Sequence, residues 1–115
     1  MSVLANMGSQ LTRRFGEVLI DLPARAKKGE VIEIRALILH PSQNQSAESE
    51  KIFIEEVAVD FDGKTFCHFD WSSMISPNPQ LAVPLRAEKS GLIKVRWRNN
   101  RGQTSSGEKS LRVDD

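Results

Sequence analysis

The sequence predicts a single all-β domain, a sandwich of about seven strands. Apolar and polar residues alternate along most of the chain after residue 15, and a period of two is typical of half-buried strands. Pairs of turn-forming residues, rich in glycine, asparagine and proline, separate these segments at spacings of roughly 10 to 20 residues. The chain of 115 residues is 39% hydrophobic and 27% charged, which suits one folded domain with its own core.

The N-terminal residues 1–14 are polar and weakly periodic, so we expect them to form a mobile arm. The folded domain is therefore assigned to residues 15–115. Its first strand is predicted at residues 18–22, where every second residue is apolar. Pro23 ends this strand, because proline cannot donate a hydrogen bond to a strand ladder.

The strongest strand signal lies at residues 31–39, after a Lys-Lys-Gly-Glu turn. One face of this segment is isoleucine and alanine, whereas Glu33 and Arg35 mark the other face. Leu37 and Leu39 continue that second face and make the far end apolar on both sides. We therefore expect another surface to cover this end of the strand.

A phase change is visible in the strand predicted at residues 52–61, which follows a long polar loop at residues 42–51. Ile52 and Ile54 point one way, and the later apolar residues point the other way. Such a change predicts a β-bulge, or a strand that passes from one buried face to another.

The second half of the chain supplies the remaining strands. Asp62-Gly63 predicts a tight hairpin turn. Pro84 has no amide hydrogen, so its strand is expected at a sheet edge. No helix-length amphipathic segment interrupts the series, and the general plan is immunoglobulin-like. The predicted strands are residues 64–71, 81–87, 92–98 and 111–113.

The charge balance excludes several classes of protein. Sixteen lysine and arginine residues against fifteen acidic residues give a formal net charge of +1, unlike a chain that wraps nucleic acid. No apolar stretch reaches the roughly 20 residues of a membrane span. The first residues lack the basic and apolar regions of a secretory signal, which by itself favours the cytoplasm.

No residue pattern predicts catalysis, a metal site or a cofactor. Cys67 precedes His68, but neighbours in a strand point to opposite faces, so this histidine cannot readily activate the thiol. We interpret Cys67 as a small buried hydrophobic residue, with a thiol enzyme as the less favoured alternative. His40 is the other histidine, and the spacing of these three residues favours no metal site.

A basic strip is predicted on the strand at residues 92–98. Lys94, Arg96 and Arg98 alternate with core residues and therefore share one exposed sheet face. An alternative function is thus a stand-alone β-sandwich module that binds a protein or an anion through this face. Aromatic residues that would stack on bases are not interleaved, so we expect no nucleic acid partner.

Several segments, in order along the chain, resemble the SoxZ family, the smaller subunits of periplasmic SoxYZ sulfur-carrier complexes. The most specific of them is a strand that ends in His-Pro. The resemblance covers about residues 22–114. The matching segments are GEVIEIRALILHP at 29–41, Asp62-Gly63, Asn78-Pro79 before a strand, and SGLIKVRW at 90–97.

The resemblance implies a non-catalytic subunit that needs no cofactor and forms a heterodimer. In this family the subunit binds SoxY, whose mobile C-terminal Gly-Gly-Cys-Gly-Gly arm carries sulfur intermediates during thiosulfate oxidation, and helps to present that arm to other sulfur-oxidation enzymes. This chain has no such arm, so Cys67 is not the carrier cysteine. The resemblance also implies that the subunit is exported already bound to its signal-bearing partner, and hence a periplasmic location.

We expect the partner face at the strand ends whose second side is also apolar. The His-Pro and Asn-Pro segments are expected to lie next to it. The predicted partner-binding residues are Leu37, Leu39, His40, Pro41, Ile52, Ile54, Asn78 and Pro79.

Overall fold

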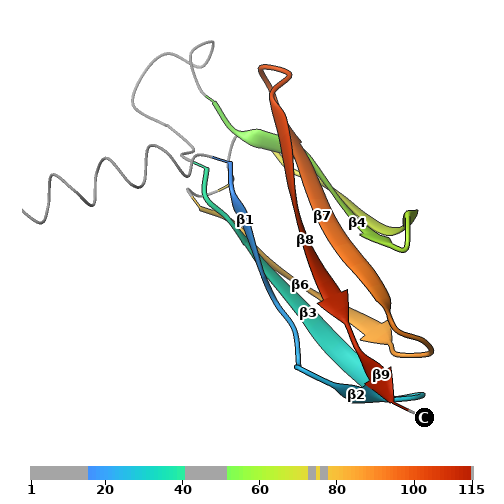
Figure 1. Ribbon diagram of the computed structural model, residues 1–115. Coiled ribbons are helices and arrows are strands. Elements are labelled where there is room, and N and C mark those ends of the chain that lie inside the picture. Colours follow the sequence, from blue (N-terminus) through green and yellow to red (C-terminus); the bar gives the residue numbers. More distant parts are fainter. Residues whose placement is uncertain (1–15, 41–51, 73–74, 76–77, 115) are drawn as a thin grey trace, which may run out of the picture.

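The computed structural model describes residues 16–40, 52–72, 75 and 78–114, and these residues form an all-β sandwich (Figure 1). One sheet has the strand order β1-β3-β6, with bounds Val18–Asp21, Val31–Ile38 and Gln80–Arg86. The second has the order β5-β4-β7-β8, with bounds Lys64–Asp70, Ile54–Phe61, Gly91–Asn99 and Thr104–Leu111. A short parallel pair joins β2 (Ala26–Lys27) to β9 (Val113–Asp114). The predicted mobile arm and the 42–51 loop lie outside the described residues.

The core lies between the two sheets and follows the predicted alternation. In β3 every second residue from Ile32 to Ile38 is buried, and in β7 the same holds from Ile93 to Trp97. Each large aliphatic side chain buried in this way contributes about 1.5–3 kcal/mol. Pro84 lies in β6 at the edge of its sheet, as its missing amide hydrogen predicts.

The predicted turn and bulge are both present around β4. Asp62 and Gly63 have φ values of 49° and 83°, the left-handed region that a tight hairpin turn requires. The β4–β7 register shifts between Ile54 and Glu56. The bulge turns Ile54 towards the same core as Val57, and both side chains are fully buried. The phase change in the sequence therefore reflects a bulge.

Two of the nine described strands, β2 and β8, were missed by the sequence analysis. The β8 segment Thr-Ser-Ser-Gly-Glu-Lys-Ser-Leu has no apolar alternation, but it pairs with β7 along its whole length. At Gly107 the edge of β1 approaches so closely that a Cβ atom would lie 2.5 Å from the Val18 carbonyl oxygen. Long-range pairing, and not local pattern, therefore creates β8.

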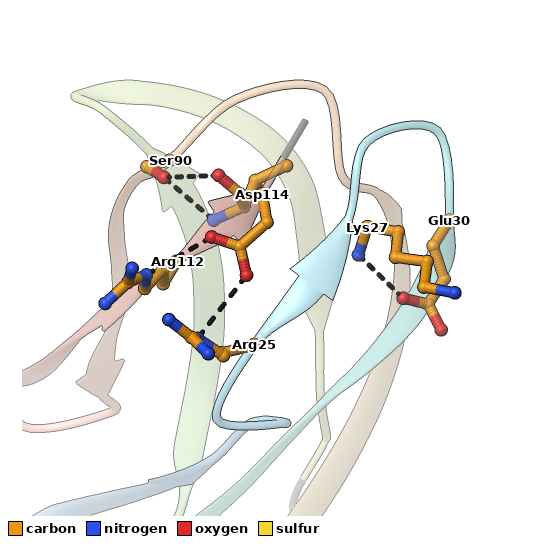
Figure 2. Close-up of polar contacts among 7 residues, drawn as sticks. Arg25, Lys27, Glu30, Ser90, Arg112 and Asp114 are labelled. Atoms are coloured by element: carbon orange, nitrogen blue, oxygen red, sulfur yellow. Dashed lines mark hydrogen bonds and ion pairs between the residues drawn. The ribbon is translucent and has the colours of Figure 1, made fainter.

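Polar contacts close the end of the sandwich that carries β2, β9 and the C-terminus (Figures 1 and 2). The Asp114 carboxylate lies 3.4 Å from Arg25 Nε and 3.3 Å from Arg112 Nε. Ser90 Oγ accepts a hydrogen bond from Val113 N at 2.8 Å and donates one to Val113 O at 3.3 Å. These contacts attach the last strand to the rest of the chain.

Candidate partner-binding site

The opposite end of the sandwich brings together most of the residues predicted for the partner face. His40 N donates to Asn78 Oδ1 at 3.0 Å, and Asn78 N donates to His40 O at 2.8 Å. Ile38 N donates to Pro79 O at 3.0 Å. Asn78 adopts a φ of 49°, a conformation that asparagine tolerates better than most residues. The end of β3 and the start of β6 are thus joined, while Pro41 lies beyond the described ranges.

His40 is fully buried and forms the centre of a polar cluster beneath this end. Its ring packs edge-on against Trp97, with 5.1 Å between ring centroids, and its Nε2 lies 3.1 Å from Asn99 Nδ2. Asn99 Oδ1 accepts the backbone N–H groups of Arg101 and Gln103 at 3.0 and 2.9 Å, which orients the amide. Nδ2 must then donate to His40, so His40 Nε2 is an acceptor in a neutral imidazole.

Asn99 was not predicted as a functional residue, although the Asn-Asn pair at 99–100 marks a turn in the sequence. Its amide also donates to Gln103 Oε1 at 2.8 Å, so every polar atom of this buried side chain is used. The neighbouring Asn100 bonds Phe53 twice, as donor from its backbone N and as acceptor at Oδ1, both at 3.0 Å. The β7–β8 turn is thereby connected to the start of β4.

The predicted partner-binding residues divide into surface and interior positions. Asn78 is exposed, and three apolar members are half-buried at the surface: Leu37, Leu39 and Ile52. Three others are buried within the chain and support the surface from beneath: His40, Ile54 and Pro79. Ile54 is interior because the bulge turns it towards the core, and His40 because Asn99 and Trp97 enclose it.

The outer face of the β1-β3-β6 sheet forms an apolar groove at this end. Leu37 lies between Leu19 of β1 and Gln80 of β6 in the strand register. The groove has a volume of about 620 Å³, and the apolar part of its lining includes Leu19, Leu37, Leu81 and Ala82. Such a surface, apolar at its centre and open to solvent, is typical of protein–protein contacts.

Charged residues border this groove and largely neutralise one another. Arg35 bonds the Glu33 carboxylate, and Asp21 lies opposite Arg35 in the register. The hydrogen bond that Arg35 Nε donates to the Glu33 carboxylate, together with the negative charges of Glu33 and Asp21, raises the pKa of Arg35, so the guanidinium stays charged. One cation and two acids thus form a polar border around the apolar row.

The basic strip lies on the opposite outer face, where it lines a second groove of about 390 Å³. Acidic residues of β4 pair with two of its three cations. Arg96 Nε lies 3.0 Å from Asp60 Oδ2. Arg98 has two acidic neighbours: its Nη2 lies 2.9 Å from Glu56 Oε1, and its Nη1 lies 3.4 Å from Glu55 Oε2. This pairing removes much of the positive potential that the sequence of β7 alone suggests.

The same pairing shifts the ionisation of both acids. Burial raises the pKa of Asp60, but hydrogen bonds from Thr65 and Arg96 outweigh burial and lower it overall. The hydrogen bond from Arg98 lowers the pKa of Glu56. Little unpaired positive charge therefore remains on this strip to attract an anion, which argues against the alternative of an anion-binding module.

Cys67 and His68 point to opposite faces of β5, as predicted. The half-buried Cys67 packs against the core beside Phe69 and Trp71. On the outer face, His68 Nδ1 lies 3.7 Å from Asp70 Oδ1. Together with Glu56, these two residues form a group of possible metal ligands, because their ligand atoms all lie within 4.8 Å of one another. The sequence spacing did not indicate this group.

The fold and the site define a small β-sandwich protein that presents an apolar, charge-bordered face on its three-stranded sheet. A family model described as "Sulphur oxidation protein SoxZ" matches residues 20–110, and the chain therefore belongs to the SoxZ family. This match confirms the resemblance seen in the sequence. No curated protein matches the chain. Within the described residues, no helix is long and apolar enough to cross a membrane.

Solved structures with similar folds include a sulfur carrier and several reductases. The sulfur carrier protein SoxY from Chlorobium limicola f thiosulfatophilum is 13% identical, covers 97% of this chain and 99% of its own, and has a TM-score of 0.63. A variant superoxide reductase (neelaredoxin) from Ignicoccus hospitalis is 15% identical, with coverages of 99% and 100% and a TM-score of 0.72. One from Archaeoglobus fulgidus is 18% identical, with coverages of 90% and 94% and a TM-score of 0.64. At such identities the similarity concerns the fold alone.

Proposed function

We propose that this chain is the non-catalytic subunit of a SoxYZ-type sulfur-carrier complex. It binds a SoxY-like subunit as a heterodimer and helps to present the partner's cysteine arm to other sulfur-oxidation enzymes during thiosulfate oxidation. Membership of the SoxZ family is the observation that carries this proposal. The chain itself supplies no cofactor and no carrier cysteine, and it acts in the periplasm after export with its signal-bearing partner.

The partner face is proposed to be the apolar groove and the adjoining end of the sandwich. Leu37 and Leu39 lie on this side of β3, and the exposed Asn78 lies beside them through its bonds to His40. The buried His40–Asn99 cluster holds these segments in fixed positions. A rigid apolar surface loses little conformational entropy on binding, which favours a stable complex.

A matched pair of variants tests this face. Leu37→Glu places a charge in the groove, whereas Val31→Glu places one on the same face of β3 at its other end, where the side chain is 57% exposed. We expect Leu37→Glu to weaken binding of the SoxY-like subunit at least about 30-fold and Val31→Glu to leave it within about threefold. Co-purification and calorimetry of the two subunits measure this.

Capture from the native periplasm of thiosulfate-grown cells tests the function itself. Intact-mass analysis should find a stoichiometric partner with sulfur adducts on a C-terminal Gly-Gly-Cys segment. Recovery of the chain alone, or only from the cytoplasm, would overturn the proposal.

A further inference from the structure

The outer edge of β5 lies on the other sheet of the sandwich, away from the apolar groove. Among the described strands, β5 pairs only with β4 and so ends its sheet. Its outer side chains are unusually accessible: Phe66 is 40% exposed, and the side chains of His68 and Asp70 are 48% and 79% exposed. An open strand edge is a template for pairing with another strand.

The hydrogen-bond pattern shows which backbone groups this edge offers. Trp71 N donates to Glu55 O at 2.7 Å, so Trp71 directs its backbone groups towards β4. Because this direction alternates along an antiparallel strand, His68 and Asp70 direct their N–H and C=O groups away from β4. These two residues can therefore bond an added strand.

A bulge limits the usable length of the edge. Val59 pairs with Cys67, but the next residue, Asp60, pairs with Thr65, so Phe66 is the extra residue on β5. A bulge interrupts regular pairing on both sides of its strand. Regular pairing is thus confined to residues 67–71.

We propose that a second copy of this chain occupies this edge, with the two β5 strands antiparallel about a two-fold axis at Phe69. In this register His68 of each copy faces Asp70 of the other, and the two Phe69 side chains face each other. An axis at His68 would oppose two histidines, and an axis at Asp70 would oppose two carboxylates. An axis at Cys67 would place the bulged Phe66 in the pairing. Charge complementarity therefore selects the Phe69 register.

This surface is separate from the proposed SoxY face, because β5 belongs to one sheet and the groove to the other. The proposal thus goes beyond the proposed function and does not depend on it. Occupation of both surfaces together would produce an assembly with two copies of each subunit.

Complementation between two charge variants tests the His68–Asp70 contacts. In a dimer of His68→Asp, the new carboxylate at position 68 of each copy faces the Asp70 carboxylate of the other. In a dimer of Asp70→Lys, the new lysine at position 70 of each copy faces His68 of the other. Each variant alone is expected to dissociate about tenfold more readily than the wild type in sedimentation equilibrium. In an equimolar mixture, the new carboxylate at position 68 of one copy faces the new lysine at position 70 of the other. A gain in dimer on mixing supports the proposal, because no contact within one copy can produce it.

Absence of that gain, or a wild-type chain that stays monomeric up to millimolar concentration, would overturn the proposal. The full chain is used throughout, and thermal unfolding of each variant checks that it is folded.

Disulfide trapping tests the register independently. Residues at the axis form a non-hydrogen-bonded pair, whose Cα atoms lie about 4.5 Å apart, within the range for a disulfide. Phe69→Cys in a Cys67→Ser background should form a covalent dimer on mild oxidation. Lys64→Cys in the same background is the control, since position 64 lies far from the axis, and it should not. Equal crosslinking of both variants, or a rapid disulfide between native Cys67 residues, would overturn the register. If Phe69→Cys does not fold, the mixing experiment decides.

Discussion

The two outer faces of the sandwich reach low net charge in different ways. On the β1-β3-β6 face, an apolar row at Leu19 and Leu37 is bordered by a few charges. On the β5-β4-β7-β8 face, the cations of β7 lie beside the acids of β4 and the hydroxyl-bearing residues of β8. A run of like charges in one strand therefore does not predict a charged surface, because a neighbouring strand can carry the opposite sign.

The largest expected effect comes from the buried cluster beneath the apolar face. Asn99→Ala removes the acceptor of two backbone N–H groups and the donor to His40. We expect a loss of about 3 kcal/mol in the free energy of unfolding, because buried polar groups lose their partners. Urea denaturation measures it, and partner affinity should fall as well because the groove loses its support. Asn100→Ala, in the same turn, is the control and should cost less than about 1 kcal/mol.

An equal loss in both asparagine variants would show that the turn, and not the buried cluster, holds this end of the sandwich.

A smaller effect is expected from the ion pair on the opposite face. Asp60→Asn keeps the shape of the side chain but removes its charge next to Arg96, and we expect a loss of about 1–2 kcal/mol at neutral pH. The folded-state pKa of Asp60 lies below its ordinary value of about 3.9, so the charge stabilises the fold above that pH. This contribution is lost as the pH falls through the folded-state pKa.

Stability measured against pH should therefore show the wild type and Asp60→Asn converging below about pH 4. A constant difference between them at all pH values would show that the charge of Asp60 is not the cause.

The smallest effect is expected from the basic strip itself. Replacing Lys94, Arg96 and Arg98 together with glutamine should leave the affinity for a SoxY-like partner within about threefold, because the proposed partner face is on the other sheet. Calorimetry at two salt concentrations measures both the affinity and its salt dependence. A large loss with a reduced salt dependence would favour the binding-module alternative and would reverse the roles assigned to the two faces.

Much of the candidate site could be predicted from the sequence, but the burial and the pairing of its residues could not. The apolar second face of β3 at Leu37 and the turn at Asn78-Pro79 were visible as local patterns. The burial of His40 depends on Asn99 and Trp97, residues more than 50 positions away along the chain. The pairing of Arg96 with Asp60 depends in the same way on which strand lies beside β7.

The sequence by itself determined which residues alternate towards the core, where the tight turns lie, and to which family the chain belongs. These properties are local or are carried by short segments, so a period of two and a few motifs are enough to indicate them. The tertiary structure alone decided that a polar segment becomes β8, that a bulge turns Ile54 inward, and that the basic strip is neutralised. The physical reason is that strand pairing joins residues distant in sequence, and the partner across the sheet determines what each side chain can contact.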